Sequence, residues 1–503
     1  MWGRRFSPAN RFFQGYSQRG KLRLPAVSYT LPLLSILIPV YNEEEFIRAV
    51  LDRVLAAPLP STGHAQDREL IVVDDGSTDG TPEAVQDYMR DRPEAPIRLL
   101  RHGRNQGKGA AVRTALEQAT GEFTIIQDGD LEYDPREYGK LLHPLLAGDA
   151  DVVYGSRFVV AGERRVLYFW HAFANRLLTT ICNIFADLNL TDIETCYKVF
   201  RTPLIQSIPI RSNRFGIEPE ITVKLAKRQA RIYEVPISYH GRTYEEGKKI
   251  GFSDAVAAVG VLLRAWVSGD TYKEEGPEIL HVLSGANRFN RWMADVVSPY
   301  LGQSVLELGA GMGNLSRLLS PRRRRYVATD IDVEHIARLR FRLQHRPNLE
   351  TAICDLMRPE HFEPFRSQMD SVVCLNVVEH IEDDLLGLRN IYSALRPGGK
   401  AIVLVPQGQG VYGTLDVALG HFRRYSKSEL ESKMKECGFR VERVLEFNRV
   451  TYPGWYFNGR ILRKRTFSRF QLSVFDWMVP LWRRIDRLLP WPPTSVIGVG
   501  VRD

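Results

Sequence analysis

Glu122-Phe-Thr-Ile-Ile-Gln-Asp-Gly-Asp-Leu-Glu-Tyr-Asp-Pro135 joins an apolar run to a cluster of acidic residues, and the first half of the chain is interpreted around it. Residues 123–126 are typical of a short buried parallel strand. Asp128, Asp130 and Glu132 follow that strand directly. Because α/β proteins bind ligands at the carboxyl ends of parallel strands, these hard carboxylates predict a Mg²⁺ or Mn²⁺ site that holds phosphates. For an isolated Asp-x-Asp pair, a solvated acidic turn is the alternative.

The overall composition indicates a folded protein of two or three domains. The chain has 503 residues, of which 44% are hydrophobic and 25% are charged. Its five cysteines form no C-x-x-C pair, which favours a reducing cytosol and argues against structural zinc. The amino terminus has no signal-peptide core, and no apolar run approaches the roughly 20 residues of a spanning helix. We therefore expect a cytoplasmic protein that could contact the inner face of the membrane peripherally.

The net charge of +9 suits nucleic acid, an anionic membrane surface or phosphate-bearing substrates. The sequence has no zinc-finger, helix-turn-helix or RNA-recognition signature. Nucleic acid is therefore the least favoured partner, and we expect none.

Three further apolar runs precede the quoted stretch, at residues 34–40, 70–73 and 97–100. Each run ends in polar or Gly-rich residues, and helical periodicity follows it. Strands that alternate with helices in this way predict a doubly wound parallel sheet.

The ends of these runs carry residues suited to binding a nucleotide. Asp74 and Asp75 could accept hydrogen bonds from a base and a ribose. Lys108, between two glycines, could reach a phosphate while the backbone approaches closely. One such loop is weak evidence, whereas four in order from one sheet are strong.

Four motifs together resemble the inverting family-2 glycosyltransferases with the GT-A fold, and most closely the dolichyl- or polyprenyl-phosphate sugar synthases. The resemblance covers about Ser35 to Ile250, and its motifs are Pro-Val-Tyr-Asn-Glu43, Val72-Val-Asp-Asp-Gly-Ser-Thr-Asp-Gly-Thr81, Arg104-Asn-Gln-Gly-Lys-Gly109 and Gln127-Asp-Gly-Asp-Leu-Glu-Tyr-Asp-Pro135. It implies a UDP- or GDP-linked nucleotide sugar as donor and a polyprenyl-phosphate or glycan acceptor. The residues that it implies for nucleotide binding are Pro39, Tyr41, Glu43, Asp74 and Lys108. The metal ligands that it implies are Asp128, Asp130 and Glu132.

Later segments resemble the acceptor side of the same subgroup. By that resemblance Arg157 lies near the diphosphate and the acceptor, and Arg242 and Lys248 belong to a basic loop that closes over phosphates. If the acceptor is a hydroxyl, a carboxylate such as Asp192 must take its proton. A solvated basic face is the alternative for these cations. The aromatic segment 166–190 and the helix expected over 252–267 could lie against a lipid or acceptor surface, or form a plain core.

A second series of predicted strands and helices follows the polar stretch 268–277. Ser304-Val-Leu-Glu-Leu-Gly-Ala-Gly-Met-Gly-Asn314 predicts a strand, a Gly-rich turn with free backbone N–H groups and then a helix. The next strand, 326–329, ends in Asp330, which is placed to bind a ribose diol. Such a turn alone could equally be a dinucleotide site.

Three later segments, 352–356, 371–381 and 395–406, each supply a strand with its end or turn, and they decide against a dinucleotide site. The whole set resembles the class I S-adenosylmethionine-dependent methyltransferases over roughly Asn287 to Asp503. The alternating run 495–502 would be the antiparallel last strand. The cofactor-binding residues that the resemblance implies are Glu307, Gly309 and Gly311 in the turn, Asp330 at the ribose, Asp355 at the adenine, and Asn376. His380 or His421 could be a general base for a hydroxyl, although each is more often structural. The aromatic stretch 455–491 suits a lid or a peripheral membrane face, or a packed insertion over the acceptor.

The predicted fold class is α/β with two doubly wound domains, a GT-A glycosyltransferase fold followed by a Rossmann-like class I methyltransferase fold. The expected parts are a basic tail (1–33), the first domain (34–267), a linker (268–285) and the second domain (286–503). We expect both halves to be active, which makes the protein a bifunctional transferase. The alternatives are that one half is a binding module, or that the chain is a basic membrane-surface scaffold. The sequence identifies neither the sugar nor the two acceptors.

Overall fold

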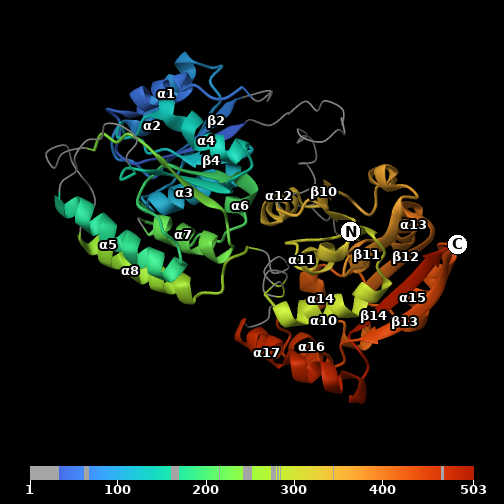
Figure 1. Ribbon diagram of the computed structural model, residues 1–503. Helices are drawn as coiled ribbons and strands as arrows, with labels where there is room; N and C mark the ends of the chain where they lie inside the picture. Colours follow the sequence, from blue (N-terminus) through green and yellow to red (C-terminus); the bar gives the residue numbers. More distant parts are fainter. Residues whose placement is uncertain are drawn as a thin grey trace, which may run out of the picture. The chain divides into compact units, whose positions relative to one another are not determined.

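The computed structural model describes residues 33–61, 67–159, 169–214, 216–241, 252–273, 279, 283, 285–343, 345–465 and 469–503. The chain divides into two compact units, Met1–Lys273 and Glu274–Asp503, each built on its own seven-stranded sheet (Figure 1). The division falls inside the stretch expected as a linker. The two basic-loop residues Arg242 and Lys248 lie outside the described residues, and so does nearly all of the expected basic tail.

The sheet of the first unit has the order β3-β2-β1-β4-β6-β5-β7. Its strands are β1 (Leu34–Val40), β2 (Arg68–Asp74), β3 (Ile97–Arg101), β4 (Phe123–Ile126), β5 (Val152–Ser156), β6 (Lys198–Arg201) and β7 (Ile232–Pro236). The first four strands are mutually parallel, as predicted. β6 runs antiparallel to both β4 and β5, so the sheet is mixed rather than wholly parallel.

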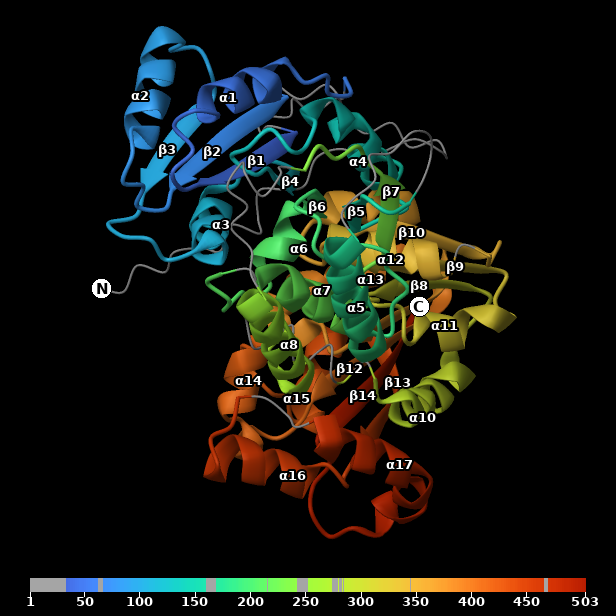
Figure 2. The ribbon, with the colours of Figure 1, turned by 90° about the vertical axis from the view of Figure 1, so that its left-hand side faces the viewer.

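Helices cover both faces of this sheet. They are α1 (Ile47–Ala56), α2 (Thr81–Asp91), α3 (Lys108–Gln118), α4 (Tyr138–Leu146), α5 (Phe169–Ala186), α6 (Thr202–Gln206), α7 (Ile217–Lys227) and α8 (Phe252–Val267). Figures 1 and 2 show α1 and α2 on one side of β1 to β3 and α3 on the other. Because both faces are covered, the central strands are apolar along their length, and every residue of β4 is buried.

The parallel arrangement brings the carboxyl ends of β1, β2 and β4 to one edge of the sheet. Val40 pairs in register with Asp74, and the last residue of β4, Ile126, pairs with Leu37 of β1. The loops that leave these strands therefore meet, and they contain most of the side chains predicted to bind the nucleotide and metal.

The sheet of the second unit has the order β10-β9-β8-β11-β12-β14-β13. Its strands are β8 (Ser304–Leu308), β9 (Arg325–Asp330), β10 (Leu349–Ile353), β11 (Met369–Leu375), β12 (Leu395–Pro406), β13 (Phe439–Phe447) and β14 (Ser495–Arg502). The first five are parallel. The prediction for residues 495–502 is confirmed, because β14 lies antiparallel between β12 and β13.

Alternate residues of these strands face two separate cores. Val372 and Val403 belong to one core, while their neighbours Val373 and Ile402 belong to the other, as the two-residue period of a strand requires. The helices that cover the two faces are α10 (Asn287–Val297), α11 (Ser316–Leu319), α12 (Val333–Arg342), α13 (Asp384–Ala394), α14 (Thr414–Leu419), α15 (Lys427–Glu436), α16 (Tyr452–Tyr456) and α17 (Arg469–Ile485). All five cysteines of the chain are buried and unpaired.

α5 and α8 lie side by side (Figures 1 and 2). Both carry large apolar side chains that are exposed, among them Phe173, Ile184 and Trp266. This exposure fits the amphipathic character predicted for 166–190 and 252–267. Within the described part of the chain, no helix is both long enough and apolar enough to cross a membrane.

Candidate functional site

A chain of ion pairs at the edge of the first sheet links the first turns of α3 and α7 to the loop after β4. Lys108 Nζ lies 2.9 Å from Asp128 Oδ1 and 3.2 Å from Glu218 Oε1. Burial by itself would lower the pKa of the Lys108 ammonium. The neighbouring acidic groups, Asp128 first among them, outweigh burial and hold the pKa well above its usual value. Lys108 is therefore a charged group at the place where a phosphate was expected.

The turn before Lys108 depends on glycine and on one buried carboxylate. Gly107 has a φ of +101°, and a Cβ there would lie 2.3 Å from the Asn213 carbonyl oxygen. Asp75 accepts the backbone N–H of Gln106 at 3.0 Å and of Gly107 at 2.7 Å, and its Oδ1 lies 2.6 Å from His102 Nδ1. Both Asp75 oxygens thus shape the turn before Lys108, and its contact with a base or ribose stays a prediction.

Asp74, the other member of this pair, is fully buried. Its Oδ1 accepts the Ser77 backbone N–H at 3.1 Å, and its Oδ2 lies 3.1 Å from Arg101 Nε. The Arg101 side chain is half exposed, so it can move aside. The contact of Asp74 with a nucleotide stays a prediction.

Pro39, Tyr41 and Glu43 occupy the end of β1 and the loop that follows it, and all three are partly exposed. The Glu43 backbone N–H donates to Thr81 Oγ1 at 2.9 Å, which ties this loop to the start of α2. The predicted nucleotide-binding residues thus lie on connected loops of one sheet edge.

The three acids after β4 do not share one role. Asp128 contacts Lys108, while Asp130 Oδ1 accepts the Glu132 backbone N–H at 3.1 Å. Glu132 Oε2 accepts the Tyr239 hydroxyl at 2.8 Å. Among the described residues these three side chains do not form a compact metal-ligating group. Asp128 and Asp130 remain hard oxygen donors suited to Mg²⁺ or Mn²⁺, whereas Glu132 is occupied by Tyr239.

Arg157 and Asp192 form a buried pair. Arg157 Nε and Nη2 donate to the two Asp192 oxygens at 2.6 and 2.8 Å, and the Arg157 backbone N–H adds a third bond at 3.1 Å. Asn175 donates a fourth at 3.0 Å. Burial opposes the charge on Asp192, but Arg157 outweighs it and lowers the pKa of this carboxyl. The predicted role of Asp192 as a base is disfavoured, because a low-pKa carboxylate with four donors is a poor proton acceptor.

Two acids in this region were missed as single residues, although both lie in motifs that were recognised. Burial first, and then the Glu218 carboxylate, raise the pKa of Glu194 to about 7. Glu218 is buried, and its Oε2 has no hydrogen-bond partner among the described residues. Glu194 lies near Lys198, and Glu218, the second residue of α7, lies beside Lys108. The sequence does not show these tertiary contacts.

A pocket of about 660 Å³ opens near this edge, between the end of α1 and the loop after β4. Its lining includes Arg53, Leu131, Tyr133 and His240. None of the predicted site residues lines it.

The Gly-rich turn of the second unit follows β8. Gly309 and Gly311 have φ values of +72° and +52°, a region that favours glycine. A Cβ on Gly309 would also lie 2.3 Å from Val377 Cγ2, which belongs to the loop after β11. The turn therefore has the backbone conformation that was expected of a cofactor-binding loop.

Glu307 lies on β8, just before the turn. Its carboxylate is buried, and Oε2 accepts hydrogen bonds from Ser316 and, at 3.1 Å, from the Tyr326 hydroxyl. Burial raises the pKa of Glu307 to about 7. The carboxylate thus joins β8 to α11 and β9, and its place beside the cofactor stays a prediction.

Asp330 lies at the end of β9, beside the turn. Its Oδ2 accepts the Gly311 N–H at 2.7 Å, and its Oδ1 accepts the Asp332 N–H at 2.9 Å and lies 3.4 Å from His335 Nδ1. Burial would lower the pKa of His335, but the Asp330 interaction outweighs it and raises that pKa to about 8. A carboxylate has four acceptor positions, so Asp330 keeps capacity for a ribose diol.

The other two predicted cofactor residues follow the next strands. Asp355 is partly exposed, and its Oδ1 accepts the Met357 N–H at 2.9 Å. Asn376 is exposed with a φ of +56°, directly after β11. Both lie at the carboxyl edge of the sheet, as Asp330 does.

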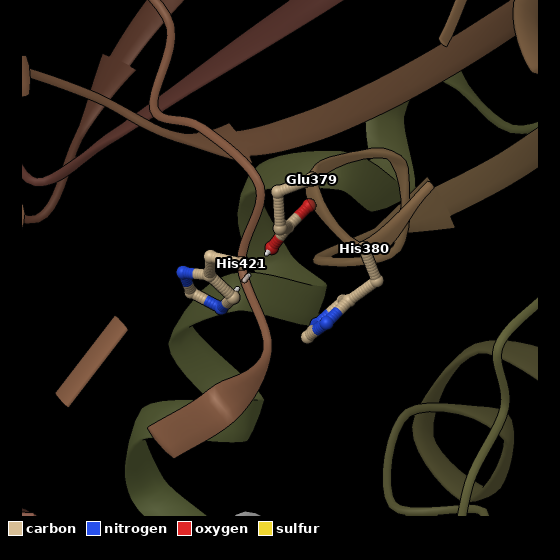
Figure 3. A group of neighbouring side chains, drawn as sticks. All are labelled: Glu379, His380 and His421. Carbon is tan, nitrogen blue, oxygen red and sulfur yellow. Dashed lines mark ion pairs between the residues drawn. The ribbon is translucent and has the colours of Figure 1, made fainter. Parts of the chain in front are cut away.

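Glu379, His380 and His421 gather in the second unit (Figure 3). One potential ligand atom of each lies within 4.8 Å of the others, and His421 Nε2 is 4.0 Å from Glu379 Oε1. Among the described residues this is the one such group of three. Asp416 Oδ1 lies 3.0 Å from His421 Nδ1 and accepts from Arg424 Nε at 2.8 Å. Sequence reasoning singled out both histidines, but it did not bring Glu379 to them.

Comparison with known proteins gives two separate family matches. Residues 35–208 match the glycosyl transferase family 2 model, and residues 306–401 match a methyltransferase domain model. These matches, with the two mixed α/β sheets, confirm the predicted fold class for both halves of the chain.

Curated relatives match over less than half of the chain. The low-salt glycan biosynthesis hexosyltransferase Agl6 of Haloferax volcanii is 30% identical over 45% of this chain and 52% of its own length. The dodecaprenyl-phosphate galacturonate synthase of Rhizobium johnstonii is 26% identical over 43% of this chain and 61% of its own length. The chain thus spans about half to two thirds of the lengths of these relatives.

A solved structure, glucosyl-3-phosphoglycerate synthase of Mycobacterium tuberculosis with Mn²⁺ and UDP, is 19% identical at a TM-score of 0.36. It covers 49% of this chain and 82% of its own length, and its TM-score is too low to support a comparison of function. The family matches do support an assignment of the two domains. The chain therefore contains a glycosyl transferase family 2 domain at residues 35–208 and a methyltransferase domain that includes residues 306–401.

Proposed function

We propose that this protein is a bifunctional transferase. Its first domain transfers a sugar from a UDP- or GDP-linked donor to a polyprenyl phosphate, with inversion at the anomeric carbon. Its second domain transfers a methyl group from S-adenosylmethionine to an acceptor of the same glycan or lipid pathway. The observation that carries the sugar-transfer half is the contact between Lys108 and Asp128 where three parallel-strand loops meet.

Lys108 and the two aspartates suit the handling of a departing diphosphate. A Mg²⁺ or Mn²⁺ ion bound by Asp128 and Asp130 would supply charge neutralisation of the diphosphate. Lys108 stays protonated between Asp128 and Glu218, so it can pair with a phosphate oxygen without any change of its proton. The nucleotide would lie along the loops of Pro39, Tyr41 and Asp74.

The Arg157–Asp192 pair supports a phosphate acceptor over a hydroxyl acceptor. A phosphate oxygen is already anionic near neutral pH and needs no base, whereas a hydroxyl needs one. Asp192 is disfavoured as that base by its four donors. Arg157, Arg242 and Lys248 are the cations proposed to bind the acceptor phosphate. A hydroxyl acceptor would instead point to Glu194, whose pKa of about 7 suits proton transfer.

The methyl-transfer half needs mainly positioning. The sulfonium of S-adenosylmethionine is intrinsically reactive, so the protein must hold donor and acceptor in line. The glycine backbone of the Gly309–Gly313 turn, Asp330 and Asp355 lie at one sheet edge, where the cofactor is proposed to bind. Their arrangement supports cofactor binding but does not identify the methyl acceptor.

Separate substitutions test the two halves. Purified full-length protein should bind a nucleotide sugar with Mn²⁺, and S-adenosylmethionine, in calorimetry. Asp128→Ala should abolish sugar transfer and leave methyl transfer intact, while Asp330→Ala should do the opposite. If one half shows neither binding nor transfer, that half is a binding module. If both are silent and the protein floats with anionic liposomes, the scaffold alternative holds instead.

A further inference from the structure

Glu379 is the most unusual carboxylate in the second unit, because it is fully buried and neither of its oxygens has a hydrogen-bond partner among the described residues. A buried polar group without a partner costs stability in either protonation state, and native proteins rarely keep one without a reason. This stability cost indicates that a bound ligand or ion pairs with the Glu379 carboxyl group.

The neighbours of Glu379 are ligands rather than counter-ions. Figure 3 shows the His380 and His421 rings on either side of the Glu379 carboxylate. The two rings are 4.8 Å apart between centroids and nearly perpendicular, at 79°, so they do not stack. One nitrogen of each ring falls within the same 4.8 Å group as a Glu379 oxygen. Two imidazoles and one carboxylate are a donor set that divalent transition metals bind.

Asp416 holds the His421 ring in the way that carboxylates hold metal-binding histidines. Its Oδ1 lies 3.0 Å from Nδ1 of His421, which leaves Nε2 of the ring turned toward Glu379 at 4.0 Å. Metal-binding histidines usually donate their other ring N–H to a carboxylate in this way, which sets the tautomer. Asp416 is itself held by Arg424 Nε at 2.8 Å and by Trp455 Nε1 at 3.2 Å.

Arg424, the guanidinium of this buried cluster, bonds Asp416 at 2.8 Å and makes no hydrogen bond to Glu379. Glu379 therefore keeps two oxygens without a partner among the described residues, and buried polar groups are normally hydrogen-bonded or coordinate metals.

We propose that Glu379, His380 and His421 form a binding site for a divalent first-row transition-metal ion such as Zn²⁺ or Mn²⁺. Ligands about 2.0–2.2 Å from such an ion lie roughly 3–3.5 Å from one another, so a ligand–ligand distance of 4.8 Å would shorten by about 1.3–1.8 Å on binding. The same nitrogen cannot both bind an ion and accept a proton, so this role replaces the general-base role predicted for His421.

The site lies next to the Gly-rich turn. Glu379 and His380 are on the short 3₁₀ helix Val378–His380 after β11, and Val377 contacts the position of a Gly309 Cβ. Three protein ligands leave coordination positions open, as in catalytic zinc sites. Those positions would take an oxygen of the methyl acceptor, and this last step rests on the proposed methyl transfer.

The test measures metal binding without any transfer reaction, so its failure is distinct from failure of the proposed function. Full-length protein carrying Asp128→Asn and Asp130→Asn, which removes the other proposed metal site, is stripped with a chelator and titrated with Co²⁺. We expect one equivalent to bind and to give a visible absorption band shaped by nitrogen ligands. Zn²⁺ should displace the Co²⁺ and raise the melting temperature.

In the same background, Glu379→Gln, His380→Asn and His421→Asn should each weaken Zn²⁺ binding by at least about tenfold. His345→Asn, an exposed histidine of the same unit, should leave binding unchanged. The proposal is overturned if the parent binds no Co²⁺, or if the three substitutions leave stoichiometry and spectrum as they were. The Co²⁺ titration of the parent tests the proposal even if one of the three variants fails to fold.

Discussion

Lys108 Nζ lies 2.9 Å from Asp128 Oδ1, and this contact joins the first residue of α3 to the loop after β4. The two side chains come from the exits of β3 and β4, which end at one edge of the sheet because β1 to β4 are mutually parallel. A cation beside a carboxylate at this point can accept a phosphate while the carboxylate binds a metal ion. The sugar-transfer chemistry proposed for the first domain follows from this relationship.

Lys108→Met should lower kcat/KM for sugar transfer by about 10²–10³-fold, the range found when one preorganised electrostatic contact is removed. Methyl transfer by the same protein should not change, which provides an internal control. Lys140→Met is the matched control, because Lys140 is an exposed lysine that pairs with Glu137 on the same domain. Equal losses from the two lysine variants would contradict the role of Lys108.

Asp192→Leu should destabilise the first domain by about 3–5 kcal/mol, because it leaves the largely buried Arg157 guanidinium without its carboxylate. The pKa of Asp192 is lowered in the folded state, so its contribution is present above the ordinary Asp pKa and is lost as pH falls through the folded value. The variant should therefore lose less stability than the parent on acidification. Urea unfolding at several pH values measures both effects. The double variant Arg157→Met with Asp192→Leu should recover much of the loss, and no recovery would show that the pair is not the cause.

Gly309→Ala should weaken S-adenosylmethionine binding by at least about tenfold, since the new Cβ meets Val377 Cγ2 at 2.3 Å and the backbone φ is +72°. Gly398→Ala is the control, because Gly398 has a φ of +75° but nothing within 4 Å of the added Cβ. It carries the same backbone strain without the contact. Calorimetry on both variants separates the two, and an equal loss of affinity would assign the effect to strain alone.

Glu307 should make the second domain less stable as pH rises from about 5 to 8. Its pKa is about 7 in the folded state and is lower in the unfolded chain, so the unfolded chain ionises first and is favoured. Glu307→Gln should remove this slope and gain up to about 2–3 kcal/mol over the parent at pH 8. Glu360→Gln, at an exposed position, should leave the slope as it is. Parallel stability curves for the parent and Glu307→Gln would rule the account out.

The bounds of the first four strands were largely predictable, because buried parallel strands are continuous apolar runs. β1 and β4 occupy the predicted residues, 34–40 and 123–126. β6 was not predicted as a strand, because only two of its four residues, Val199 and Phe200, are apolar. Its antiparallel direction depends on the connection, which the pattern of a strand does not contain.

The candidate sites were predictable as motifs but not as contacts. Asp74 and Asp75 are adjacent in sequence, yet Asp75 binds the backbone of the next loop and Asp74 pairs with Arg101. Glu307 was expected beside a cofactor, and the sequence did not show that its buried carboxylate bonds Ser316 and Tyr326. Glu379 gave no signal at all, because burial of a single carboxylate next to a distant histidine depends on tertiary packing.

The most direct test of the central claim is sugar transfer to a polyprenyl phosphate. Full-length protein would be incubated with Mn²⁺, a polyprenyl phosphate and a panel of UDP- and GDP-sugars. The lipid products would be identified by mass spectrometry. The account predicts a glycosyl-phosphoprenol product from one donor class, abolished by Asp128→Asn and retained by Asp330→Asn. No lipid product from any donor, or equal product from Asp128→Asn, would contradict it.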